Sequence, residues 1–284
     1  MKMEFFEKQS YSLSEIKQIF KEQNLPLRDV EVVLCDLLSI DRTTYQFHDD
    51  AIYDVLEVER LDEVLQKMQS GMPVEYITEK ASFWKHTFTV SESVLIPRPE
   101  TELIIEKVLE YYDKDQSLNI LDLGTGSGIL AISLAAEFPK SAVKALDISR
   151  DALQIAKSNA DRILDASDIQ FIQSDWYQSL GNEKFDLIVS NPPYITLDEY
   201  HGLEGKVRGF EPRFALTDDA DGLAHYRIIA SHAELHLNRG AHIMVEHGEG
   251  QSSSLNKIFI QNGFQIVENV VDLSQKNRIL IAKI

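Results

Sequence analysis

From Asn119 onward, short apolar runs typical of strands alternate with longer amphipathic runs typical of helices. This alternation predicts a parallel sheet covered by helices on both faces. Only five residues separate the last two strand patterns, and so short a connection requires an antiparallel pair. We therefore expect an α/β fold with a doubly wound sheet of seven strands, one of them antiparallel near the edge. The strands are expected at residues 119–123, 142–147, 169–173, 185–190, 241–246, 264–272 and 278–282, and the helices at residues 129–138, 152–163, 223–237 and 251–261.

The beginning of the chain shows helical spacing without a strand pattern. Ser12 or Ser14 can cap a first helix, and two further helices are predicted at residues 27–38 and 61–68. This much helix indicates a small separate domain. Such a domain could recognise a partner or could be a packing extension, and the sequence leaves both interpretations open.

Between Tyr76 and Ile96 the pattern changes to short β-like runs, which predicts a hairpin. We therefore divide the chain into three parts. They are a helical domain at residues 1–80, for which substrate recognition is one of the two interpretations, a β-hairpin linker at residues 81–97 and a large α/β domain at residues 98–284.

Composition excludes several classes of protein. The chain has 284 residues and a formal net charge of −18, which argues against affinity gained by wrapping nucleic-acid phosphates, because such binding needs clustered Lys and Arg. Cys35 is the only cysteine, so an internal disulfide framework and a cysteine-rich zinc site are excluded. The histidines show no metal-ligand spacing. Without a signal peptide or a long apolar run, we expect a cytoplasmic protein with no bound metal and no membrane association.

A glycine-rich turn, Asp122-Leu-Gly-Thr-Gly-Ser-Gly128, follows the first expected strand of the sheet. Its glycines allow a tight turn and a close approach of a ligand to the backbone. The turn differs from the dinucleotide fingerprint G-x-G-x-x-G because its third glycine comes one position early. At the ends of the next two strands, Asp147 could accept both hydroxyls of a ribose, and Asp175 and Trp176 could meet the amino group and the face of an adenine. Each of these residues could instead have only a structural role, such as a helix cap.

Asn191-Pro-Pro-Tyr194 follows the fourth expected strand. The two prolines stop strand pairing and lack an N–H, so this segment is a stiff loop whose carbonyl oxygens have few competing donors. The Asn191 side-chain oxygen and the Pro192 carbonyl, next to the ring of Tyr194, form a cluster of acceptors that could bind a flat NH2 group. A simple strand-terminating turn is the alternative interpretation of the two prolines.

These segments are expected to meet. In a doubly wound sheet, ligands bind at the carboxyl ends of the strands, where the strand order reverses. The first and fourth strands should flank that point, which brings the glycine turn beside the acceptor cluster, with Asp147 and Trp176 along the same edge. We therefore expect a cofactor that carries a nucleoside to lie against the cluster. Arg98, held between two prolines, is a further candidate for ligand contact.

In combination, the glycine turn, the acid of the second strand and Asn-Pro-Pro-Tyr resemble the S-adenosylmethionine-dependent methyltransferases that act on amino or amide nitrogen. More specifically, the sequence resembles the peptide chain release factor N5-glutamine methyltransferases, known as PrmC or HemK. The resemblance covers the chain from about residue 71 to its end. The motifs that carry it are Ile96-Pro-Arg-Pro-Glu-Thr-Glu102, Asp122–Gly128, Ser174-Asp-Trp176, Asn191–Tyr194, Glu211-Pro212 and Asp221-Gly-Leu223.

The resemblance implies a class I methyltransferase (Rossmann-like) fold and S-adenosyl-L-methionine as cofactor. It implies methyl transfer to the side-chain amide nitrogen (N5) of the glutamine in the Gly-Gly-Gln loop of class I release factors, which would be the protein partner. We further expect a monomer without direct nucleic-acid binding. The implied catalytic residues are Asn191, Pro192 and Tyr194, and Pro193 joins them in substrate binding. The implied cofactor-binding residues are Gly124, Thr125, Gly126, Ser127, Gly128, Asp147, Asp175, Trp176, Asn191 and Arg98.

An amide nitrogen is a poor nucleophile because its lone pair is delocalised into the carbonyl group. We hypothesise that Asn191 Oδ1 and the Pro192 carbonyl accept its two N–H bonds while Tyr194 packs on the amide plane. The alternative within enzymes is methylation of N6 of adenine or of the guanine amino group in nucleic acid, against which the negative charge counts. A module that senses the cofactor without catalysis is the alternative outside enzymes.

Overall fold

The computed structural model describes residue 8 and residues 10–164 and 169–284, and the chain divides into two units. One unit comprises Met1–Lys80 and Glu204–Phe210, and the other comprises Ala81–Leu203 and Glu211–Ile284. Each unit has a buried apolar core of its own.

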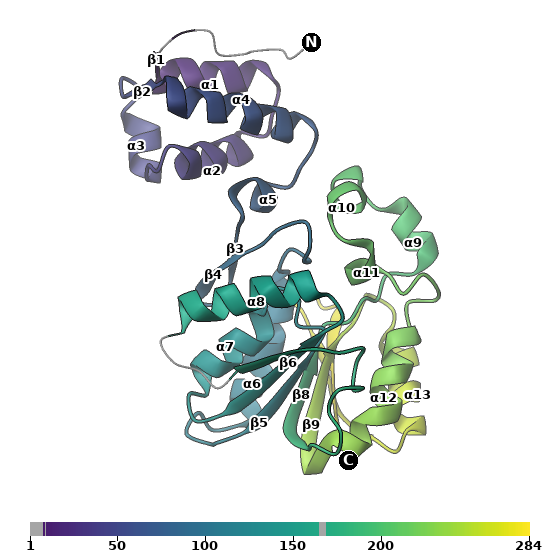
Figure 1. Cartoon of the computed structure of the whole chain (residues 1–284). Coiled ribbons are helices and arrows are strands. Elements are labelled where there is room, and N and C mark those ends of the chain that lie inside the picture. Colours follow the sequence, from purple (N-terminus) through teal and green to yellow (C-terminus); the bar gives the residue numbers. More distant parts are fainter. Residues whose placement is uncertain (1–7, 9, 165–168) are drawn as a thin grey trace. The chain divides into compact units, whose positions relative to one another are not determined.

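Helices make up most of the first unit (Figure 1). Ser12 begins its first helix with a capping box, in which the Ser12 hydroxyl accepts from Glu15 N–H and the Glu15 carboxylate accepts from Ser12 N–H. The prediction of helices alone is wrong in one respect, because two short strands pair antiparallel. Strands of three residues are too short to show an alternating pattern. The elements are β1 (Ser10–Ser12), α1 (Leu13–Glu22), α2 (Leu27–Leu37), α3 (Arg42–Phe47), β2 (Ile52–Asp54), α4 (Val55–Gln69), α5 (Val74–Thr78) and α10 (Gly205–Phe210).

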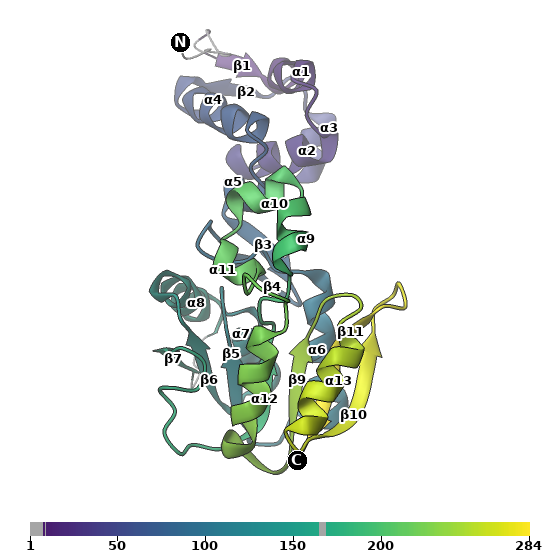
Figure 2. The ribbon, with the colours of Figure 1, turned by 90° about the vertical axis from the view of Figure 1, so that its right-hand side faces the viewer.

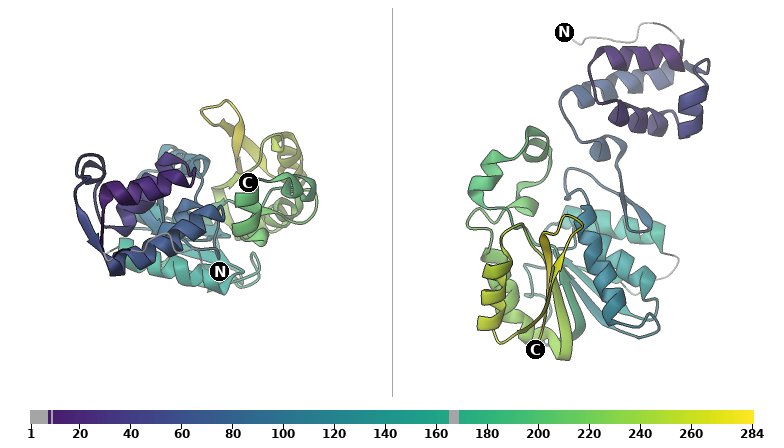
Figure 3. Two further views of the ribbon diagram at one scale, coloured as in Figure 1. Left: turned by 90° about the horizontal axis from the view of Figure 1, so that it is seen from above. Right: turned by 180° about the vertical axis from the view of Figure 1, so that it is seen from behind.

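The main sheet belongs to the second unit. Within the described ranges it has seven strands in the order β10-β11-β9-β8-β5-β6-β7. Neighbours from β9 to β7 pair in parallel, whereas β11 is antiparallel to both β9 and β10, and β10 forms the edge. The last two strands, β10 and β11, are coloured yellow in Figure 3. The predicted doubly wound sheet is confirmed, and its order reverses between β5 and β8. The strands are β5 (Asn119–Leu123), β6 (Ala142–Asp147), β7 (Ile169–Gln173), β8 (Phe185–Ser190), β9 (Leu237–Glu246), β10 (Gln265–Val271) and β11 (Asn277–Lys283).

Helices cover both faces of this sheet (Figures 1 and 2). Successive strand residues point to opposite faces, so Ile120 belongs to one core and Leu121 to the other. The strands are therefore apolar on both sides, as parallel strands between two helical layers must be. On one face lie α6 (Glu102–Tyr111), α7 (Ile129–Glu137) and α8 (Arg150–Ile163), and on the other lie α12 (Ala224–His236) and α13 (Ser252–Gln261).

Several boundaries differ from the predictions. Strand β9 begins at Leu237, earlier than predicted. The prediction placed its start too late because Asn238-Arg-Gly240 interrupts the apolar pattern of the strand. Helix α9 (Leu197–Gly202) and helix α11 (Arg213–Leu216) lie in the stretch between β8 and α12, where no element was predicted. The predicted hairpin is present as β3 (Lys80–Phe83) and β4 (His86–Thr89), and a short 3₁₀ helix, η1 (Pro99–Thr101), precedes α6.

Candidate active site

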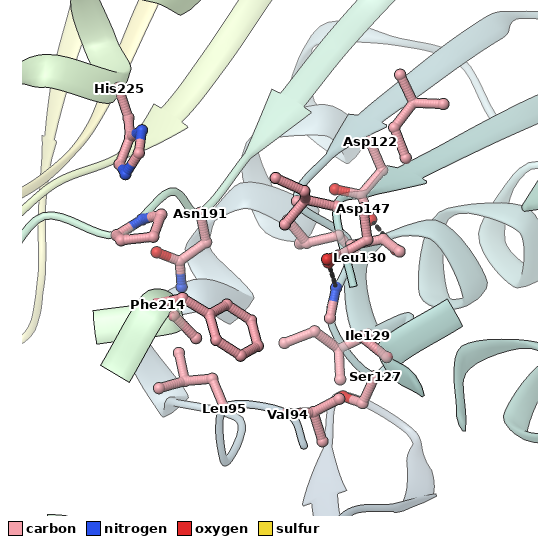
Figure 4. Close-up of a pocket in the computed structure, with 18 of the residues that line it drawn as sticks. Val94, Leu95, Asp122, Ser127, Ile129, Leu130, Asp147, Asn191, Phe214 and His225 are labelled. Atoms are coloured by element: carbon pink, nitrogen blue, oxygen red, sulfur yellow. Dashed lines mark hydrogen bonds between the residues drawn. The ribbon is translucent and has the colours of Figure 1, made fainter. Parts of the chain in front are cut away.

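A cavity of about 370 Å³ lies at the carboxyl ends of β5, β6 and β8 (Figure 4). The glycine turn after β5 and Asn191 after β8 both contribute to its wall. Gly128, Pro192 and Tyr194 adjoin lining residues in the chain without lining the cavity themselves. The predicted site residues that line it are Arg98, Gly124, Thr125, Gly126, Ser127, Asp147, Asp175, Trp176, Asn191 and Pro193.

The glycine turn is open toward a ligand at two of its three glycines. Gly124 and Gly126 have left-handed φ angles of +73° and +56°, and a Cβ atom at either position would meet no atom within 4 Å. Gly128 has another role, because a Cβ atom there would lie 2.8 Å from Ile132 Cδ1. Backbone atoms therefore form one wall of the cavity, and they leave room for a group to approach closely.

Asp147, at the end of β6, is fixed by two backbone N–H groups. Its Oδ2 accepts from Gly126 N–H at 2.9 Å and its Oδ1 accepts from Ser149 N–H at 2.8 Å. Burial raises the pKa of this carboxyl, and the two N–H donors oppose that effect. Each oxygen retains further acceptor capacity for a ligand on the cavity side, which suits a pair of hydroxyl groups.

Asp122, the fourth residue of β5, is fully buried and lines the same cavity. Its Oδ2 accepts from Thr125 Oγ1–H at 2.6 Å and from Ala131 N–H at 3.2 Å, whereas Oδ1 has no partner among the described residues. Burial raises the pKa of this carboxyl to about 7. A buried oxygen without a partner is costly, so it is expected to accept from a ligand. Asp122 was not among the predicted site residues, although a carboxylate at the end of an apolar strand was a usable signal.

The cavity wall is rich in carboxylates. Arg98 is the one Lys or Arg side chain among the lining residues that the structure describes. Its Nη2 donates to both oxygens of Glu211, at 2.6 and 2.8 Å, and Glu211 is buried. The charge of Arg98 is thus already neutralised, and the cavity favours a ligand with positive charge. The lining carboxylates belong to Asp122, Asp147, Asp175, Asp218 and Asp219.

Asn191 is held by a chain of hydrogen bonds that leads to a buried carboxylate. Its Nδ2 donates to Thr101 Oγ1 at 3.0 Å, and Thr101 Oγ1–H donates in turn to Glu246 Oε2 at 2.6 Å. The Tyr194 hydroxyl donates to the other carboxylate oxygen, Oε1, at 3.4 Å. Burial raises the pKa of the Glu246 carboxyl to about 7 and also raises the pKa of the Tyr194 phenol, which is therefore a neutral donor.

Two aromatic residues in the wall were missed by the sequence analysis. Phe214 is half exposed on α11, and His225 on α12 packs its ring 5.1 Å from that of Trp176. In Figure 4, Asn191, Phe214 and His225 lie on one side of the view and Asp122 and Asp147 on the other. Phe214 and His225 do not follow a strand of the sheet, so no pattern in the sequence indicated that they lie at the site.

Two family models match the chain. The PrmC N-terminal domain matches residues 12–78, and the methyltransferase small domain matches residues 100–201. In the described ranges, no helix is long and apolar enough to span a bilayer. No group of three or more His, Cys, Asp or Glu side chains suited to a metal ion is found in the same ranges.

Two curated relatives are similar to this chain over most of their own length. A release factor glutamine methyltransferase from Francisella tularensis subsp. tularensis is 38% identical over 251 residues, which is 88% of each chain. One from Salmonella typhimurium is 35% identical over 267 residues, covering 94% of this chain and 95% of the relative. The crystal structure of a methyltransferase from Pyrococcus furiosus aligns with 69% of this chain and 87% of its own, at 18% identity and a TM-score of 0.52. This likeness concerns the fold alone and, with the methyltransferase domain match, confirms the predicted class I methyltransferase fold.

Proposed function

Because the chain belongs to the family of release factor glutamine methyltransferases, we propose that it methylates the glutamine of the Gly-Gly-Gln loop in class I peptide chain release factors. S-adenosyl-L-methionine is the methyl donor, and the acceptor atom is the side-chain amide nitrogen, N5. The observation that carries this proposal is the position of Asn191 in one cavity with the glycine turn. A methyl donor and a flat amide can therefore meet in a single site.

The residues of the cavity fit this cofactor. Gly124 and Gly126 leave open space beside the backbone, and Asp147 has acceptor capacity for the ribose hydroxyls. Asp122 Oδ1 lacks a partner in the described structure and would accept from the ammonium group of the methionine part. Asp175 and Trp176 would hold the adenine, and we also assign Thr125, Ser127 and Arg98 to the cofactor side, whereas Gly128 closes the turn against Ile132.

When bound, the cofactor would supply a methyl group on a positively charged sulfur, and that sulfur would retain the bonding electron pair on transfer. Asn191 Oδ1 and the Pro192 carbonyl would accept the two N–H bonds of the substrate amide and direct its nitrogen at the methyl carbon. The N–C bond would form as the S–C bond of the donor breaks. The amide nitrogen gains positive charge, which the two acceptor oxygens stabilise, and it then loses one proton to solvent. Pro193 and Tyr194 would complete the substrate side.

We assign the docking of the release factor to residues 1–80, with residues 81–97 as a β-hairpin linker and residues 98–284 as the methyl-transfer domain. The match of residues 12–78 to the PrmC N-terminal domain supports this division. We further propose that the enzyme is a cytoplasmic monomer that binds no nucleic acid directly. The lining carboxylates together with the net charge of −18 oppose contact with phosphates.

A competition assay tests this function. The protein is incubated with S-adenosylmethionine, an unmethylated release factor, unmodified ribosomal RNA and DNA, and mass spectrometry follows each acceptor. We expect the release factor alone to gain the mass of one methyl group. Methyl transfer to nucleic acid alone would instead establish the adenine or guanine amino group as acceptor, and cofactor binding without any transfer would establish a sensing module.

A further inference from the structure

Behind Asn191, two buried side chains from distant parts of the chain meet. Thr101 ends η1 and Glu246 ends β9, and both side chains are buried, with residue exposures of 0% and 1%. Their hydrogen bond joins residues 145 positions apart, at 2.6 Å. Neither residue lines the cavity, so neither is placed to contact a ligand directly.

The direction of each hydrogen bond follows from the chemistry of Glu246. An ionised carboxylate only accepts, so the hydroxyl proton of Thr101 points at Glu246. Thr101 Oγ1 then offers only a lone pair to Asn191, and a lone pair requires the NH2 side of the amide. Asn191 Oδ1 must therefore point away from Thr101. No hydrogen bond to Asn191 Oδ1 occurs among the described residues.

We propose that Thr101 and Glu246 are positioning residues, which fix the Asn191 amide so that its oxygen faces the substrate amide. This inference rests on the proposed function. With the Asn191 amide turned over, its NH2 group would face the NH2 group of the substrate glutamine, and two donors cannot bind each other. The Thr101–Glu246 pair thus selects the one orientation of Asn191 that can hold the substrate nitrogen.

The same carboxylate holds the second polar side chain of the acceptor segment. Glu246 Oε1 accepts from the Tyr194 hydroxyl, so one buried group fixes both ends of Asn191–Tyr194. A buried carboxylate opposes folding unless its hydrogen bonds compensate. The backbone of Tyr194 is held independently, because Gln251 Nε2 donates to its carbonyl oxygen at 2.8 Å. Removing the Glu246 carboxylate should therefore disturb the side chains of the segment more than its path.

The direct test is Thr101→Val, which keeps the shape of the side chain and removes the hydroxyl. Assayed with the release factor above the pKa of Glu246, this variant should lose about 10- to 100-fold in kcat, the scale of effect known for misplaced catalytic groups. Its Kd for S-adenosylmethionine, measured by calorimetry, should change by less than about twofold, because the substitution removes no contact with the cofactor. Thr101→Ser, which restores a hydroxyl, should recover kcat to within about threefold of the parent.

Ser133→Ala is the matched control. Ser133 is buried in α7, and its hydroxyl has no partner among the described residues, so this variant should keep the parent kcat. Parent kcat in Thr101→Val, or a cofactor Kd that weakens as much as kcat falls, would overturn the positioning role alone. A parent enzyme that does not methylate the release factor would overturn the proposed function and this inference with it.

Glu246→Gln keeps the test decisive should Thr101→Val fail to fold. The hydroxyls of Thr101 and Tyr194 donate to different carboxylate oxygens, and a carboxamide replaces one of these acceptors with an NH2 donor, so one of the hydroxyls must reverse. We expect kcat to fall by about tenfold with cofactor affinity retained. A Glu246→Gln enzyme with the parent kcat would overturn the proposal.

Discussion

The two halves of the cavity are built in different ways. The cofactor half consists of the glycine turn at 124–128 and Asp147, and its geometry is set by backbone N–H groups and strand ends. The acceptor half depends on Asn191, whose amide is oriented by Thr101 and Glu246 through side-chain hydrogen bonds alone. The geometry of the cofactor half is thus set by the backbone. The geometry of the acceptor half is set by a few side chains that are linked by hydrogen bonds.

This difference predicts which kinetic quantity each half controls. A backbone-built cradle binds the cofactor equally before and during methyl transfer, so damage to it should appear in the Kd of the cofactor. An acceptor that acts on charge developing at the substrate nitrogen should affect kcat. Substitutions in the two halves should therefore have separable effects.

The largest effect is expected for Asn191→Ala, in the acceptor half. Loss of one preorganised polar group at the reacting atom costs about 10²- to 10³-fold in kcat. Cofactor affinity should change by less than about threefold, because Asp147 and the glycine turn are unchanged. Single-turnover methyl transfer and calorimetry measure the two quantities. Asn256→Ala, at a half-buried position on α13, serves as control, and an Asn191→Ala enzyme with parent kcat would refute the role of the acceptor half.

Asp147→Asn should show the opposite behaviour. The new NH2 group would face either the N–H of Gly126 or that of Ser149, and the acceptors for the ribose would be weakened. Loss of charge-assisted hydrogen bonds should weaken cofactor binding by about 10- to 100-fold, with kcat at saturating cofactor nearly retained. Asp151→Asn, an exposed site at the start of α8, is the control. A fall in kcat at unchanged Kd would erase the distinction between the halves.

Substitutions at two glycines of the cofactor half should have different effects. Gly128→Ala combines a left-handed backbone with a Cβ atom 2.8 Å from Ile132 Cδ1, and should lower the free energy of unfolding by about 2 kcal/mol or more. Gly126→Ala meets no atom within 4 Å and should cost about 1 kcal/mol, its main effect being weaker cofactor binding. Chemical denaturation measures both variants. Equal destabilisation would contradict the assignment of Gly128 to packing and of Gly126 to the ligand.

The smallest effect concerns pH and tests the acceptor half. Burial and the nearby charge of Glu100 raise the pKa of Glu246 to about 7, while the Thr101 and Tyr194 hydroxyls and Arg278 oppose the shift. Above that pKa the carboxylate accepts from Thr101. Below that pKa the protonated Glu246 carboxyl group can donate a hydrogen bond to Thr101 Oγ1. The Thr101 hydroxyl can then donate its own proton to Asn191, which favours the flipped amide with Oδ1 facing Thr101.

The kcat at saturating substrates should therefore fall severalfold as pH falls through about 7. Asp122 also has a pKa near 7, so the parent profile alone does not identify the group. The comparison with Glu246→Gln does, because that variant should lack this acid limb. An identical limb in parent and variant would contradict the assignment to Glu246.

The strands and the site residues at their ends were predictable, because local patterns in the sequence indicate them. Apolar runs between turn residues located the strands, and the rule that ligands bind where strand order reverses brought the glycine turn and Asn191 to one edge. Asp147 was found because its position at a strand end is a local signal. The cofactor half is built almost entirely from such local features.

The acceptor half was only partly predictable, because its supports are remote in sequence. Thr101 and Glu246 meet only through the packing of η1 against the end of β9, and no local pattern relates them. Phe214 and His225 reach the cavity from α11 and α12, whose placement depends on the tertiary fold. Arg98 was a candidate for ligand contact, and its ion pair with Glu211 was not predicted because Glu211 lies 113 positions away.

The central claim is that the nitrogen of a glutamine side-chain amide receives the methyl group. The most direct measurement is tandem mass spectrometry of the Gly-Gly-Gln peptide from a treated release factor, followed by acid hydrolysis of that peptide. If the product is N5-methylglutamine, the fragment masses should locate the added methyl group on the glutamine. Hydrolysis should then release methylamine and leave glutamate. Methyl on another residue, or hydrolysis that gives ammonia without methylamine, would contradict this account.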